Sequence, residues 1–105
     1  QAGFYFAAPT QIDTASIAPK WDDNKKNFFE ALCVAFENSN SNDPLQLENI
    51  FKELTATHSL KPGELMLPMR IMLVGGKFGP AVFEIAATIG ILEAVARIKH
   101  ALTLL

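Results

Sequence analysis

The chain has 105 residues, half of them hydrophobic, and a formal net charge of −2 at pH 7. This length supports one domain with a small core, so a second domain is not expected. The acidic balance argues against a general nucleic-acid binder, for which a strongly basic chain is typical, and the single cysteine excludes a disulfide within the chain.

Charge is distributed unevenly along the chain. Residues 1–60 carry four lysines against eight acidic residues, a balance of −4, while residues 61–105 carry five cations against three acids, a balance of +2. A polyanion is therefore expected to meet the second half of the chain, although five cations over that length are a weak signal by themselves.

The first residues, QAGFYFAAPTQID, include three consecutive aromatic residues and a proline but no helical period. We expect an extended lead-in over the core, residues 1–20, and we interpret the abrupt hydrophobic start as that of a fragment from a longer protein. Asp13 can cap a short helix as far as Ala18, because Pro19 disfavours the helical conformation in the residue before it.

A longer amphipathic helix is predicted next. Asp22 or Asp23 can cap it, and it should run to about Glu37. Its inward stripe has three- and four-residue spacing. Aromatic residues in such a stripe are far more often core than a stacking platform for bases. The stripe consists of Phe28, Phe29, Leu32, Ala35 and Phe36.

A polar loop, residues 38–43, leads into a third helix. Asp43 can cap this helix, Pro44 takes its first position, and Gln46 has the spacing of a capping box. The helix should end near Thr57. Its inward residues are Leu47, Ile50, Phe51 and Leu54.

The segment 61–85 organises the second half of the chain. Nine of the ten residues from 65 to 74 are apolar or proline, so a helix here would be buried on nearly every side. Pro68 removes one backbone hydrogen bond, so we expect a kink there or a helix that properly starts only around it.

Arg70 is the one charged residue in this apolar run. A guanidinium cannot be deprotonated and is costly to bury without a partner. Arg70 must therefore reach either an acidic side chain, with Glu64 and Glu84 as the candidates, or the solvent and whatever binds there.

A turn should follow Arg70's helix. Glycine accepts the left-handed conformation, so the helix should stop at Gly75-Gly76, and a new one should begin at Pro80, where a missing N–H costs little. The free N–H groups and the positive end of the dipole at that start would form an anion site beside Lys77 and Arg70.

The rest of the chain completes an all-α fold. The helix from Pro80 should run to about Ile89, Gly90 should break it, and residues 92–104 should form a last helix with Val95, Ile98 and Leu102 inward. We predict a small bundle or array of about five helices, a monomeric single domain over residues 1–105, with no strand.

The sequence offers no catalytic constellation and no metal site. His58 and His100 are isolated from further ligands at metal-binding spacing. The apolar neighbours of Cys33 should raise the pKa of its thiol and leave it inert. No apolar run reaches membrane-spanning length, so we expect a soluble, cytoplasmic protein without membrane contact.

A longer motif, spread over about forty residues, is a more specific sign of function than these single residues. Residues 61–75 fit the pattern K-x-G-x-x-M-x-P-x-R-x-x-L-x-G, and Gly79-Pro80, Ile89-Gly90 and Arg97-Ile98 follow in matching order over about forty residues. Here the chain resembles the C-terminal anticodon-binding region of bacterial glutamyl-tRNA synthetases. The chain departs from the family pattern at Ile12, which stands where a tyrosine is usual in the family.

The resemblance implies a recognition module without catalytic activity or cofactor of its own. The parent ligase would use ATP and Mg²⁺ on a separate N-terminal domain to join glutamate to its tRNA. The partner would be tRNA for glutamate, with tRNA for glutamine as a second candidate, because the third anticodon base that distinguishes them is read by a preceding subdomain in similar enzymes.

The resemblance also implies which residues bind the anticodon. In similar synthetases the residues that match Arg70, Gly79, Pro80 and Val82 lie against its first two bases, although Val82 is shorter than the leucine common there. Lys77 falls in a variable turn, so its contact with a phosphate is our inference from its place in the chain.

The alternative is a helical protein-interaction module that binds no nucleic acid. Phe78, or the aromatic cluster at residues 4–6, would anchor its partner.

Overall fold

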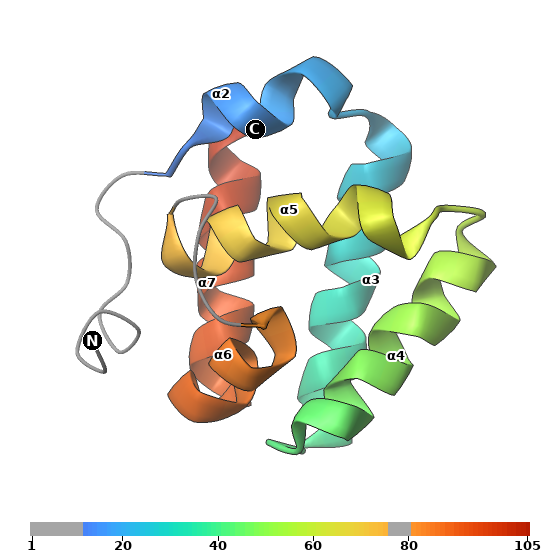
Figure 1. Cartoon of the computed structure of the whole chain (residues 1–105), viewed down its shortest axis with the longest axis vertical. Helices are drawn as coiled ribbons and strands as arrows, with labels where there is room; N and C mark the ends of the chain where they lie inside the picture. The colour runs from blue at the N-terminus through green and yellow to red at the C-terminus, as the bar shows by residue number, and fades with distance from the viewer. Residues whose placement is uncertain (1–11, 76–80) are drawn as a thin grey trace.

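The computed structural model describes residues 12–75 and 81–105, and within these ranges every regular element is helical (Figure 1). The all-α class predicted from the sequence is confirmed, and the described helices include the short one expected after Asp13. No described helix is long and apolar enough to cross a membrane. The elements are α2 (Thr14–Ile17), the 3₁₀ turn η1 (Ala18–Lys20), α3 (Asp23–Ser39), α4 (Pro44–Thr57), α5 (Pro62–Val74), α6 (Val82–Ile89) and α7 (Ile91–Leu104).

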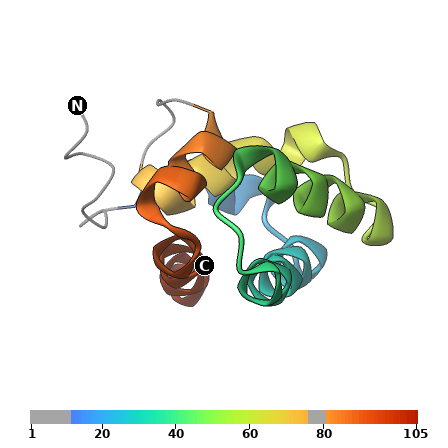
Figure 2. The same ribbon diagram turned by 90° about the horizontal axis from the view of Figure 1, so that it is seen from below.

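The longer helices form two layers. In Figure 1, α3 and α7 run side by side in opposite directions, and α5 crosses in front of them; Figure 2 shows α4, α5 and α6 together on the other side. One hydrophobic cluster lies between the layers and draws on all five of these helices. Because α5 packs on both α6 and α7, its apolar side chains are buried on several sides, as the sequence predicted.

The described part of the lead-in is helical. Residues 14–20 form α2 and η1, so the short helix expected as far as Ala18 is confirmed, and the extended conformation expected as far as residue 20 is wrong there. Pro19 does not prevent this, because it lies in the first turn of η1, where a missing N–H is tolerated. The side chain of Asp13 forms no capping hydrogen bond to α2. The backbone N–H of Asp13 donates to the carbonyl of Gly75 at 3.0 Å.

Helix α3 begins and packs as predicted. The side chain of Asp22 accepts a hydrogen bond from the backbone N–H of Lys25 at 2.8 Å, which makes Asp22 the cap. Four of the five stripe residues are fully buried and Ala35 is half-buried, so the assignment of the stripe to the core is confirmed. The buried members are Phe28, Phe29, Leu32 and Phe36.

Helix α4 also begins at the predicted cap. The side chain of Asp43 accepts from the N–H of Leu45 at 3.2 Å, and Pro44 is the first helical residue. The reciprocal half of the capping box is different: the N–H of Asp43 donates to the hydroxyl of Ser41 at 3.1 Å, so Gln46 is not needed for it. Of the predicted inward residues, Leu47 and Phe51 are buried, and Ile50 and Leu54 are half-buried against the core.

Helix α5 runs without interruption from Pro62 through Pro68, so the later start suggested for it is wrong. Pro68 is itself buried, and packing of the surrounding apolar side chains compensates for the one missing hydrogen bond. The predicted stop is confirmed: Gly75 has φ +88°, in the left-handed region, and its N–H donates to the carbonyl of Ile71 at 2.7 Å.

The last two helices meet at Gly90. Helix α6 begins at Val82, two residues after the predicted start at Pro80, and α7 begins at Ile91. Gly90 has φ +93°, a value that side-chain-bearing residues rarely adopt, and this explains the break between the helices. The side chain of Asn42, from the loop before α4, accepts from the N–H of Ile91 at 2.9 Å.

Candidate nucleic-acid interface

Arg70 lies near the C-terminal end of α5. Its neighbours Met69 and Ile71 are fully buried. Arg70 itself is partly exposed, and it interacts with other groups of the protein. The helix therefore holds the base of this side chain in a fixed place while part of it remains accessible. An ion pair with Glu64 or Glu84, both of them exposed, stays a prediction.

Three further candidates, Lys77, Gly79 and Pro80, lie outside the described residues, so their roles stay predictions. The residues that flank this stretch, Gly75 and Ala81, belong to the described part of the chain. On one side Gly75 is bonded to both α5 and Asp13, and on the other side Ala81 accepts the first intrahelical bond of α6, from Ile85 at 3.0 Å.

Val82 is the first residue of α6, and its side chain is buried in the core, 3% exposed. Its contact with an anticodon base stays a prediction. Among the described residues no side chain caps the start of α6, and the N–H groups of a first helical turn have no intrahelical partner. However, Glu84 lies in the same turn and offers a negative charge to the positive end of the dipole, which would weaken attraction for an anion.

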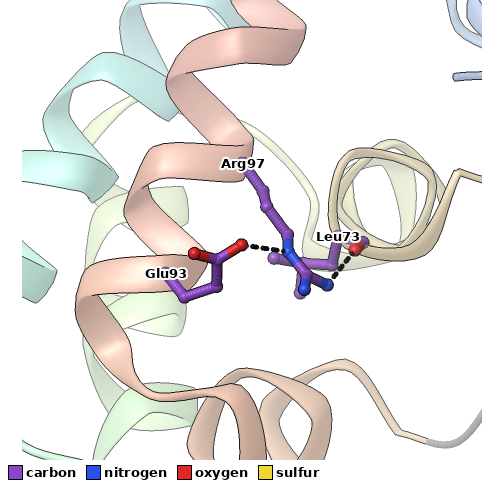
Figure 3. A network of polar contacts seen from close by, with 3 residues as sticks. All are labelled: Leu73, Glu93 and Arg97. Atoms are coloured by element: carbon purple, nitrogen blue, oxygen red, sulfur yellow. Dashed lines mark hydrogen bonds and ion pairs between the residues drawn. The ribbon is translucent and has the colours of Figure 1, made fainter. Parts of the chain in front are cut away.

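A buried polar network joins α7 to the end of α5 (Figure 3). Arg97, on α7, is only 3% exposed. Its Nε donates to Oε2 of Glu93, one turn earlier on α7, at 2.8 Å, and its Nη1 donates to the backbone carbonyl of Leu73 at 2.8 Å. The guanidinium thus bridges a carboxylate on its own helix and the last turn of α5.

Arg97 is a buried cation with incomplete pairing. Within residues 12–75 and 81–105 its Nη2 has no hydrogen-bond partner, and the side chain of Glu93 is 41% exposed. The negative end of the α5 dipole faces the guanidinium and adds to its stabilisation. Sequence reasoning gave Arg97 no role. The four-residue spacing of Glu93 and Arg97 was a visible signal for the ion pair, but nothing local pointed to Leu73.

The positive balance of the second half is partly neutralised in the fold. Nζ of Lys99 lies 3.5 Å from Oε2 of Glu37 on α3, an acid of the first half, whereas the Arg97–Glu93 pair lies within the second half and leaves its balance unchanged. Fewer cations of the second half are therefore available to a polyanion than the sequence suggested. Arg97 in particular is removed from solvent.

Cys33 is buried beside other core residues, as predicted. Burial is the main cause that raises the pKa of its thiol to about 11, so very little thiolate is present at neutral pH. Within the described ranges, no three His, Cys, Asp or Glu side chains are arranged to hold a metal ion. His58 packs edge-on against Phe28, with ring centroids 5.9 Å apart, and so contributes to the core.

Comparison with known proteins shows the family of this chain. Residues 1–102 match the anticodon binding domain family. Glutamate–tRNA ligase of Flavobacterium johnsoniae is 31% identical over 102 residues, that of Porphyromonas gingivalis 30% over 105, and that of Syntrophotalea carbinolica 32% over 103. These alignments cover 97%, 100% and 98% of this chain. No solved structure matches it significantly.

The chain spans about a fifth of the length of these relatives: 20%, 21% and 22%. The resemblance expected from residues 61–98 is confirmed, and it extends over nearly the whole sequence. The chain belongs to the anticodon-binding domain family, with glutamate–tRNA ligases as its relatives.

Proposed function

We propose that this chain recognises the anticodon of tRNA within a glutamate–tRNA ligase and positions the tRNA for ATP-dependent glutamylation by a separate catalytic domain. The match to the anticodon binding domain family over residues 1–102 carries the proposal. The tRNA for glutamate is the first partner, and the tRNA for glutamine is the second candidate. The ligase acts in the cytoplasm as a monomer, and its ATP and Mg²⁺ belong to the part outside this chain.

Arg70 supplies the physical basis for base recognition. It rises from a helix whose neighbouring side chains are buried, so its backbone is held rigidly while the residue as a whole remains partly exposed. A planar guanidinium can stack on an unpaired base or bond two atoms of its edge, which suits the single-stranded anticodon loop. Gly79 and Pro80 would complete the contact with the first two bases, and Val82, whose side chain is 3% exposed, would support them from the core.

Replacing Arg70 by alanine in the full-length ligase is expected to cost roughly 1 to 3 kcal/mol of discrimination between cognate and altered anticodons, the usual worth of a good base contact. Binding of ATP and glutamate should not change, because those sites lie in another part of the ligase. Kd values measured for tRNA transcripts that differ at one anticodon base test this.

Two further variants sharpen the Arg70 experiment. Arg70→Lys keeps the charge but loses the planar fork, so it should lose most of the same discrimination. Lys52→Ala is the matched control, because Lys52 is an exposed cation on α4, paired with Glu48 at 3.0 Å. Wild-type discrimination in Arg70→Lys would mean that Arg70 acts only as a point charge.

The salt dependence of binding separates this function from a protein-interaction module. A site that neutralises phosphates loses affinity steeply as salt rises, whereas an apolar groove hardly responds. We expect Lys77→Ala to weaken all tRNAs about equally and to reduce the slope of log K against log salt by about one unit. Fluorescence anisotropy at several salt concentrations measures this, and a flat wild-type response would favour the protein-interaction module.

A further inference from the structure

We infer that Arg97 is a positioning residue for Arg70: from α7 it holds the last turn of α5, the turn from which Arg70 projects. The inference rests on the proposed function, because it matters for recognition only if Arg70 contacts a base. Arg97 itself is too deeply buried, at 3% exposure, to contact an RNA.

The end of α5 is held by bonds from outside the helix. The last carbonyls of a helix have no intrahelical N–H partner and must find others. Here the carbonyl of Leu73 accepts from Nη1 of Arg97 at 2.8 Å, and the carbonyl of Gly75 accepts from the N–H of Asp13 at 3.0 Å. Residues far before and far after α5 in the sequence thus fix its end from two directions.

The geometry of Arg97 makes this restraint directional. A guanidinium is planar, so the bond from Nε to Glu93 also sets the direction in which Nη1 points. Water cannot easily replace the bond to Leu73, because both Arg97 and Leu73 are buried.

The restraint acts on the same turn that carries Arg70. Arg70 lies three residues before Leu73, so a shift of this carbonyl moves the backbone of Arg70 as well. Recognition sites generally need their side chains placed within roughly 0.5 Å, and the supporting shell provides that placement. Loss of the Arg97 bond should therefore loosen the contact between Arg70 and a base while α5 itself remains helical.

The test compares binding of two RNA stem-loops by the 105-residue chain. One carries the glutamate anticodon and the other differs from it at one of the first two anticodon bases. Arg97→Lys keeps the charge but cannot bond Glu93 and Leu73 in the same fixed plane, and we expect it to lower the ratio of the two Kd values at least about five-fold. Partial unfolding alone would weaken both RNAs by the same factor and leave the ratio unchanged.

A second variant and a matched control guard against misfolding. Glu93→Gln removes the charge that orients Arg97 and should lower the ratio in the same direction. Glu48→Gln is its control: Glu48 forms an ion pair of the same four-residue spacing with Lys52, at 3.0 Å, on the exposed face of α4. This variant should keep the wild-type ratio.

Amide hydrogen exchange gives a readout that does not depend on RNA. The N–H of Gly75 bonds to Ile71 at the end of α5, and the N–H of His58 bonds to Leu54 in the same way at the end of α4, at 2.9 Å. In Arg97→Lys, exchange at Gly75 should become at least about ten-fold faster than in the wild type, and exchange at His58 should not change.

The outcomes separate the two claims. If the wild type discriminates between the RNAs and Arg97→Lys keeps the same ratio, the inference is overturned and the proposed function stands, even if Gly75 exchanges faster. If exchange at Gly75 does not change, Arg97 does not hold the end of α5, and the inference is overturned as well. If the wild type shows no discrimination, the proposed function fails and the inference fails with it.

Discussion

Replacing Phe28 by alanine is expected to lower the free energy of unfolding by about 3 to 5 kcal/mol, the range for removing a large aromatic side chain from a core. Phe28 is fully buried, and its ring meets Phe29 and Phe51 edge-on at centroid distances of 5.0 Å and 5.2 Å. Truncation removes these two ring contacts and the one with His58, and it leaves a cavity between α3 and α4. Chemical denaturation monitored by circular dichroism measures the loss.

A control on the same helix makes this measurement specific. Val34 is 56% exposed, so Val34→Ala should change the stability by no more than about 0.5 kcal/mol. If Phe28→Ala kept full stability but lost RNA binding, the phenylalanine stripe would be a stacking surface and the placement of α3 in the core would be wrong.

Local chemistry predicted the helix starts well. The caps at Asp22 and Asp43, and the stop at Gly75, depend on bonds within a few residues, so the sequence indicates them directly. The later start expected around Pro68 is wrong, because the effect of this proline depends on surroundings that the sequence does not display, and a kink there stays a prediction. The α5 helix is buried on several sides, and this packing maintains the helix through the proline.

Hydrogen bonds between residues far apart in the sequence could not be predicted for the same reason. The cap of α7 comes from Asn42, a residue of the polar loop that had been interpreted only as a connector. Likewise, the carbonyl of Gly75 is satisfied by Asp13, whose expected role was to cap its own helix. In both cases the donor and acceptor are chemically ordinary, and only the tertiary fold brings them together.

For the candidate site, the sequence indicated Arg70 more clearly than the residues that hold Arg70 in place. An arginine inside an apolar run is conspicuous, because a charge there needs an explanation. Arg97 lies on an amphipathic helix where a cation at that spacing from Glu93 usually means an exposed ion pair. Its burial follows from how α7 packs on α5, and its second acceptor is a main-chain carbonyl, which no residue type can signal.

The buried position of Arg97 leads to a second large stability effect. Glu93→Ala should lower the free energy of unfolding by about 3 kcal/mol, the low end of the range for breaking a buried ion pair, because Glu93 itself is 41% exposed. The loss arises because the variant leaves a guanidinium with only the Leu73 carbonyl as partner. Urea denaturation of the purified chain measures it.

A double variant identifies the cause of that loss. If the uncompensated cation is responsible, Glu93→Ala combined with Arg97→Met should recover most of the stability, since methionine fills much of the same space without charge. The remaining deficit should be about 1 kcal/mol or slightly more, for the unsatisfied carbonyl of Leu73. A double variant as unstable as Glu93→Ala alone would contradict this explanation. The double variant should also lose anticodon discrimination while staying folded, because its uncharged side chain can no longer hold the turn of α5 that carries Arg70.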